Sequence, residues 1–155
     1  MSRTRAREAA FKALFQLDFN FEEAERDACE DLAINTAVET IIETALEKAK
    51  TKVDADKLLS QENDLPYIKQ AVKETRAHLN EIDEIISAHL KQGWQLSRIM
   101  AADRNILRLA VYEMRFVEPP LLKNIAINEA VELAKIYGTD DSSRFVNGIL
   151  EAISK

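Results

Sequence analysis

Three arginines stand within five residues at the start of the chain, and a lysine follows about two helical turns after the second of them. Arg3, Arg5, Arg7 and Lys12 belong to residues 3–19, where apolar side chains recur at helical spacing. Arg5 and Lys12 fall opposite the apolar stripe, whereas Arg3 and Arg7 are expected to overhang the core and reach solvent. Such a cluster favours phosphate contacts and, through guanidinium planes, stacking on unpaired bases. The alternative is a merely solubilising terminus.

A second candidate lies in the last predicted helix, which ends near Ile153. Asp140, Asp141 and Ser142 offer N-cap chemistry at its start. Arg144 and Gly148 fall outside its apolar stripe, and Phe145 lies at the boundary, where an aromatic ring beside arginine suits a stacked base. A glycine inside a helix costs about 1 kcal/mol relative to alanine. Either a neighbouring helix of this chain or an external ligand is therefore expected to approach its backbone.

The charge of the chain is unevenly distributed. The formal net charge is −6, and residues 22–31 alone contribute −5, because six acidic side chains there stand against the single Arg26. The remainder is nearly neutral and has one basic end. This pattern suits a partner that carries phosphate, and it disfavours a general polyanion binder, which would be basic throughout.

Composition excludes several classes of protein. A length of 155 residues with 46% hydrophobic side chains allows one domain or two small subdomains that share a core. Cys29 is the single cysteine, so no internal disulfide forms, and we expect a reducing compartment, the cytoplasm. No apolar run is long enough to span a membrane. Nucleotide-binding, serine-nucleophile and zinc-protease motifs are missing, and His78 and His89 have no partners at ligand spacing, so we expect neither metal nor cofactor.

The periodicity predicts helices and no strand, and the fold class is a compact all-α bundle of six or seven helices. Pro66 is expected to open one helix, Gly93-Trp94 to interrupt the chain, and Gly138 to end a helix as its C′ residue. Residues 51–65 are polar and predict a loop. The predicted helices are 3–19, 32–50, 66–79, 81–91, 100–116, 124–137 and about 142–153.

Three segments together resemble a known family. They are AREAAFKALFQLDF (Ala6 to Phe19), DRNILRLAVYEM (Asp103 to Met114) and AINEAVELAKIYGTDDSSRFVNGIL (Ala126 to Leu150). These runs are similar to those of the NusB family, the bacterial transcription antitermination factors. The resemblance extends over the whole length and is strongest in the last 55 or so residues.

The resemblance implies a single all-α domain over residues 1–155, built as two three-helix subdomains. It implies binding of the boxA element of leader and ribosomal RNA transcripts together with NusE, which is also a small-subunit ribosomal protein. The pair would join NusA, NusG and RNA polymerase in the antitermination complex. Some members form homodimers that cover the RNA surface. The family is not enzymatic.

The resemblance also assigns roles to individual positions. The basic start, with Lys12 beside it, would contact RNA phosphates and bases, and the D-S-x-x-F run would form the RNA edge. Phe15, where the family often has tyrosine, and Asp103, at the opening of the DRNILR helix, would receive NusE. The implied RNA-binding residues are Arg3, Arg5, Arg7, Lys12, Asp141, Ser142, Arg144 and Phe145.

Two other functions stay open at this point. One is an accessory domain like the all-α domain that precedes the catalytic part of some ribosomal-RNA cytosine methyltransferases. The other is a protein-interaction module with no role in RNA binding.

Overall fold

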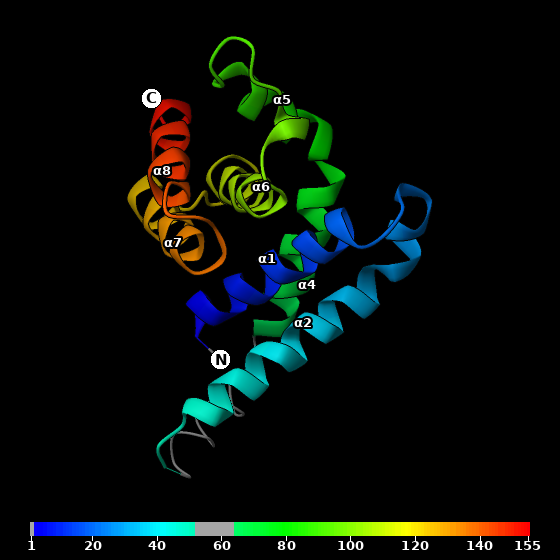
Figure 1. Ribbon diagram of the computed structural model, residues 1–155. Coiled ribbons are helices and arrows are strands. Elements are labelled where there is room, and N and C mark those ends of the chain that lie inside the picture. Colours follow the sequence, from blue (N-terminus) through cyan, green and yellow to red (C-terminus); the bar gives the residue numbers. More distant parts are fainter. Residues whose placement is uncertain (1, 52–63) are drawn as a thin grey trace. The chain divides into compact units, whose positions relative to one another are not determined.

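The computed structural model describes residues 2–51 and 64–155, and within these residues it contains seven α-helices, two short 3-10 helices and no strand (Figure 1). The predicted all-α fold is therefore confirmed. Most of the predicted loop 51–65 lies outside the described residues. The α-helices are α1 (Arg3–Phe19), α2 (Arg26–Lys48), α4 (Asp64–Ala77), α5 (Leu79–Ala88), α6 (Ala101–Arg115), α7 (Lys123–Tyr137) and α8 (Ser142–Ile153); the 3-10 helices are η1 (Glu23–Glu25) and η2 (Leu96–Arg98).

The chain divides into two compact units, residues 1–72 and 73–155. In the first unit, α1 packs lengthwise against α2 (Figure 1). Four fully buried alanines of α1 bring the two backbones close together, and Ile34 and Ile41 of α2 fill the contact. The apolar stripe predicted for α1 is buried, and Phe11 is buried with it, at 1% exposed. The four alanines are Ala6, Ala9, Ala10 and Ala13.

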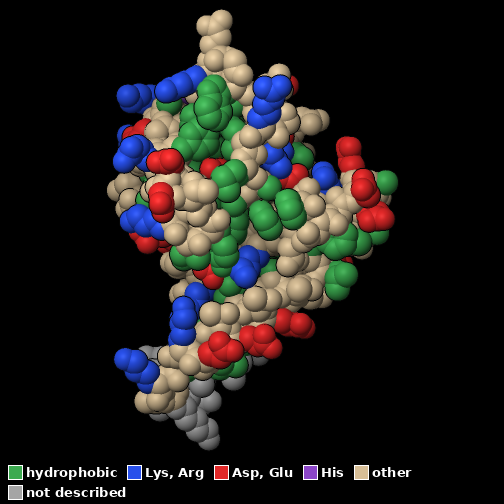
Figure 2. Space-filling model, in the orientation of Figure 1, with side chains coloured by type: hydrophobic (Ala, Val, Ile, Leu, Met, Phe, Trp, Pro, Cys, Tyr) green, Lys and Arg blue, Asp and Glu red, His purple; other side chains and the backbone are tan. Residues whose placement is uncertain are grey.

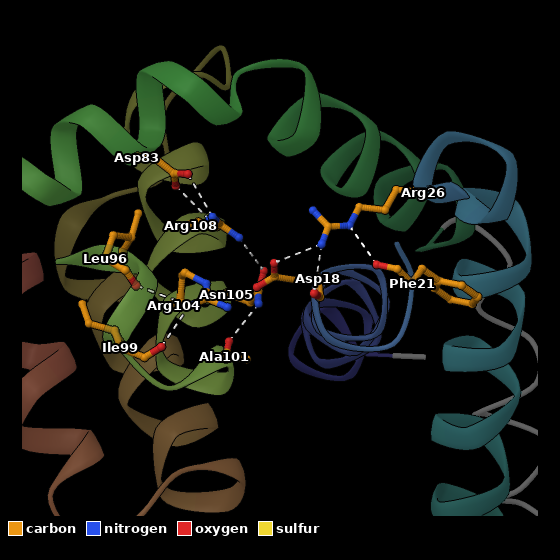
Figure 3. A network of polar contacts seen from close by, with 10 residues as sticks. All are labelled: Asp18, Phe21, Arg26, Asp83, Leu96, Ile99, Ala101, Arg104, Asn105 and Arg108. Carbon is orange, nitrogen blue, oxygen red and sulfur yellow. Dashed lines mark hydrogen bonds and ion pairs between the residues drawn. The ribbon is translucent and has the colours of Figure 1, made fainter. Parts of the chain in front are cut away.

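The second helix begins earlier than the sequence predicts. The acidic segment 22–31, expected to be partly a loop, forms η1 and the first turns of α2. Its single cation, Arg26, donates from Nε to the Phe21 carbonyl and from Nη2 to the Asp18 carbonyl, both at 3.2 Å (Figure 3). Arg26 thereby ties the end of α1 to the start of α2. Asp27 in the first turn favours the helix electrostatically.

The second unit is built around α6, which contacts α5, α7 and α8. Eleven of its fifteen residues are buried, and Ile106, Leu107, Ala110 and Val111 are among them. Arg108 on α6 is buried too, and its guanidinium makes two hydrogen bonds to the carboxylate of Asp83 on α5, at 2.8 and 2.9 Å (Figure 3). This two-point ion pair fixes α5 against α6.

None of the described helices is both long enough and apolar enough to cross a lipid bilayer.

Candidate nucleic-acid interface

The start of α1 presents its arginines around one aromatic ring. Ser2 caps the helix, since its Oγ accepts a hydrogen bond from the Arg5 backbone N–H at 3.2 Å. The Arg3 guanidinium carbon lies 4.0 Å from the centre of the Tyr67 ring, and its Nε lies 3.8 Å from an Asp64 carboxylate oxygen. Arg3 is therefore exposed yet held in place by a cation–π contact and an ion pair.

Arg7 does not reach solvent as predicted. It is 5% exposed, and its guanidinium carbon lies 5.9 Å from the centre of the Tyr67 ring. Arg3 and Arg7 stand one turn apart on α1, so both approach this ring. Arg5 and Lys12 are half-buried, and the Nη1 of Arg5 is buried with no hydrogen-bond partner in the described part of the chain.

The loop after α5 carries the one tryptophan of the chain, Trp94. Gly93 has a φ of +89°, a left-handed conformation that favours glycine, and the Trp94 N–H donates to the Lys91 carbonyl at 3.0 Å to close the turn. Arg104 of α6 then donates to the Leu96 and Ile99 carbonyls, at 3.3 and 2.9 Å (Figure 3). These contacts hold Trp94 in place although it is 58% exposed.

The start of α8 is organised by Ser142 in place of a side-chain N-cap. Asp141 occupies the N-cap position, but its side chain makes no capping hydrogen bond. The Oγ of Ser142 instead accepts a hydrogen bond from the Thr139 N–H at 2.9 Å. Gly138 ends α7, as the sequence predicts, and its backbone there is extended, with φ −97° and ψ −167°. Glycine is required there because a Cβ would overlap the Ser142 side chain.

Two residues assigned to surfaces are buried. Ser142 is 2% exposed and Asp103 is 6% exposed, which contradicts the expectations that the first lies on the RNA edge and the second on a docking face. Burial raises the pKa of the Asp103 carboxyl, and a hydrogen bond from Ser142 partly offsets that rise. The pair joins the start of α6 to the start of α8, so its role is to position the exposed residues that follow.

Those exposed residues lie together. Asp141 and Arg144 are exposed, and Phe145 is half-buried. The Phe145 ring stacks against Trp94, with centroids 6.3 Å apart and planes at 28°. From the sequence, Trp94 is expected only to interrupt the chain together with Gly93. The feature of the sequence that could have pointed to an exposed ring is that this large apolar residue directly follows a turn glycine in a polar stretch.

An aromatic pair on α1 forms a separate candidate face. Phe15, predicted to receive a partner protein, is half-buried, and its ring stacks on Phe19 with centroids 5.4 Å apart and planes at 13°. Phe19 is 67% exposed, and the sequence alone predicts no role for it. The spacing of Phe11, Phe15 and Phe19 by four residues could have revealed a continuous aromatic row.

Acidic side chains mark a surface that phosphate would avoid. Glu39, Glu43 and Glu47 follow one another at intervals of four along the exposed side of α2. Figure 2 shows Asp and Glu side chains gathered along this helix. Within the described residues, no three His, Cys, Asp or Glu side chains lie close enough together to hold a metal ion.

Comparisons with known proteins agree with the geometry. A family model described as "NusB family" matches residues 4–155. The transcription antitermination protein NusB of Bacillus subtilis strain 168 is 40% identical over 153 residues, which cover 99% of this chain and 95% of the relative. A crystal form of T. maritima NusB superposes with a TM-score of 0.75 at 32% identity, covering 99% of this chain and 91% of that one. A chain from a crystal structure of antitermination factors NusB and NusE in complex with double-stranded RNA has a TM-score of 0.70 at 30% identity, with 97% and 94% coverage.

Proposed function

The chain belongs to the NusB family, and we propose that it is a transcription antitermination factor that binds boxA RNA together with NusE. The pair would then join NusA, NusG and RNA polymerase in the antitermination complex. We treat residues 1–155 as one functional domain, which is supported by a family match that spans both compact units.

The likeness to the NusB–NusE–RNA complex is the observation that carries this proposal. It extends over 97% of this chain at 30% identity, so it is not confined to either compact unit. A likeness confined to one unit would support the fold of that unit alone. The full-length likeness supports a shared function for the two candidate regions.

The RNA surface would comprise the accessible members of the two candidate regions. Arg3 and Arg5 at the start of α1 supply positive charge for phosphates, with Lys12 further along the helix. At α8, Arg144 offers a cation and Phe145 a ring face, while the exposed Asp141 carboxylate can only accept hydrogen bonds, for example from an exocyclic amino group of a base. Arg7 and Ser142 are too buried to contact RNA directly and would hold their neighbours in position.

NusE would dock on the aromatic face of α1. The exposed ring of Phe19 and the stacked ring of Phe15 offer apolar area that a partner can cover. Because Asp103 is buried, we assign it no contact with NusE.

Gel filtration of the protein alone, with NusE, and with NusE plus a short boxA oligonucleotide tests the proposal. We expect a heterodimer that shifts further when RNA is added. A heterodimer that RNA leaves unchanged, with no RNA binding in a parallel anisotropy titration, would instead indicate a protein-interaction module.

Replacement of Phe145 by alanine tests the residue assignment. Base–aromatic stacking is worth about 1–3 kcal/mol per base, so boxA affinity should fall roughly 5-fold or more while the helical circular dichroism is retained. If the variant melts many degrees lower and binds RNA as before, Phe145 serves the core.

A further inference from the structure

The second unit contains a cavity that the proposed function does not yet use. Its volume is about 570 Å³, within the range of sites that hold small ligands. It lies between the end of α5, the loop that follows, and α8, and Trp94, Phe145 and Gly148 are among its lining residues. All of these elements belong to residues 73–155, so the cavity is formed within one compact unit.

Two aromatic rings form one side of this cavity. Trp94 and Phe145 are stacked with centroids 6.3 Å apart. Carbon atoms in contact lie about 3.5–4.0 Å apart, so a third ring inserted between two others would need about 7 Å. A planar ligand would therefore lie on the open face of Trp94, which is 58% exposed, and extend the existing stack.

Gly148 keeps another part of the cavity open. A Cβ built at this position meets no atom of the described residues within 4 Å, so none of the described helices requires a glycine there. The space above the Gly148 backbone instead belongs to the cavity. Because glycine inside a helix costs about 1 kcal/mol relative to alanine, its presence indicates that something outside the described chain uses this space.

The charges around the rings decide what the occupant is. Two cations, Lys91 and Arg144, also line the cavity and outnumber its one carboxylate, Asp141, although the chain as a whole carries −6. Cations beside aromatic faces are complementary to a flat ring attached to phosphate. An apolar side chain of a protein would use the rings and leave the cations unused.

We infer that this cavity binds one unpaired nucleobase of the RNA, stacked on the Trp94–Phe145 pair and passing over Gly148, with its flanking phosphates at Lys91 and Arg144. This inference rests on the proposed RNA-binding function and deepens it by adding Trp94 and Gly148 to the site. The stacked base must come from a single-stranded stretch, because a paired base offers no free face at a duplex interior.

Trp94 itself reports on the site, because it is the sole tryptophan and its emission isolates this cavity. Titration of the protein–NusE complex with single-stranded boxA RNA should quench Trp94 fluorescence, and NusE alone should not. In a series of RNAs that each carry one abasic nucleotide, a single position should lose the quenching. By anisotropy, Trp94→Ala should weaken RNA binding about 5- to 100-fold, and Trp94→Phe should restore most of the affinity.

Gly148→Ala separates function from folding. Alanine fits without a clash and favours the helix, so the variant should be at least as stable as the wild type yet bind RNA about 5-fold or more weakly. Asn128→Ala, on the exposed side of α7, is the matched control: it also raises helix propensity, and it should leave RNA affinity unchanged.

Three results would overturn the inference. RNA that binds without quenching, with Gly148→Ala and Trp94→Ala at wild-type affinity, would place the base elsewhere and leave the proposed function intact. Quenching by NusE alone, with weaker NusE binding by Trp94→Ala, would assign the cavity to a protein side chain. Failure of the wild-type complex to bind boxA RNA at all would remove both the proposed function and this inference.

Discussion

Replacement of Asp103 by asparagine should stabilise the protein at neutral pH, which is unusual for a buried residue in the most buried helix. Asp103 is 6% exposed, and its Oδ1 has no hydrogen-bond partner in the described residues. A buried polar atom left unpaired costs about 1–3 kcal/mol, and here the atom carries charge. Asparagine removes the charge and keeps an oxygen that can accept from Ser142, while its amide nitrogen takes the place of the unpaired oxygen, so the expected gain comes from the removed charge alone. We expect the free energy of unfolding to rise by about 1 kcal/mol at pH 7.5.

The pH dependence gives this prediction its sign. Burial raises the pKa of Asp103 in the folded state above its ordinary value of 3.8. Between pH 3.8 and the folded-state pKa, the folded protein therefore holds the proton more tightly than the unfolded chain does. Wild-type stability therefore decreases as pH rises through this window, and the full cost remains above the folded-state pKa. The advantage of Asp103→Asn should consequently shrink as the pH is lowered from 7.5 towards 3.8.

Urea unfolding followed by circular dichroism measures the difference between the two proteins at each pH, so that contributions from other groups cancel. Asp83→Asn is the matched control, because Asp83 is paired with the buried guanidinium of Arg108. That variant should lose about 1.5–3 kcal/mol, the opposite sign. If Asp103→Asn destabilises the protein at pH 7.5, or its gain is independent of pH, the reasoning is wrong. The affinity of Asp103→Asn for NusE should equal that of the wild type.

Three further outcomes are expected at the surface. Arg5→Glu should weaken boxA binding at low salt and reduce the salt slope by about 0.7, the value for one lost phosphate contact on a single strand, in anisotropy titrations at several salt concentrations. Asp64→Asn should raise RNA affinity up to about 5-fold, because its ion pair with the exposed Arg3 side chain, worth about 1 kcal/mol, no longer restrains that side chain, although Asp64 itself is buried; Glu8→Gln, which removes a nearby negative charge, should do less. Phe19→Ala should lower NusE affinity, measured by calorimetry, with little change in melting temperature, since its ring is 67% exposed.

The helices were predictable because apolar spacing reports which face is buried. The ends of α6 and α7 in the structure lie within a residue of those predicted, since α6 is the most buried helix and its pattern is dense. The start of α2 was missed because its first turns carry few apolar residues. They are helical for electrostatic reasons and through Arg26, whose hydrogen bonds to carbonyls at the end of α1 depend on tertiary structure.

The candidate sites were less predictable. Sequence spacing gives the direction of a side chain around its helix, but it does not say how far neighbouring elements cover that side chain. Arg7 lies near the core side of α1, and only the tertiary position of Tyr67 explains why its guanidinium is buried. Trp94 was not recognised because a loop has no period. Its position depends on a glycine with positive φ and on hydrogen bonds from Arg104 to two carbonyls.

The D-S-x-x-F-x-x-G run at the start of α8 has one accessible face and one buried face, because its buried residues recur at helical spacing. Asp141, Arg144, Phe145 and Gly148 follow the spacing i, i+3, i+4 and i+7, which places them on one side of a helix. Ser142 lies outside this set and begins the buried set, which continues through Val146, Leu150 and Ile153. A run that resembles a single binding motif therefore contains one face that can touch a ligand and another that fixes the helix to α6. Substitutions on the first face should change RNA affinity at constant stability, and those on the second should change stability first.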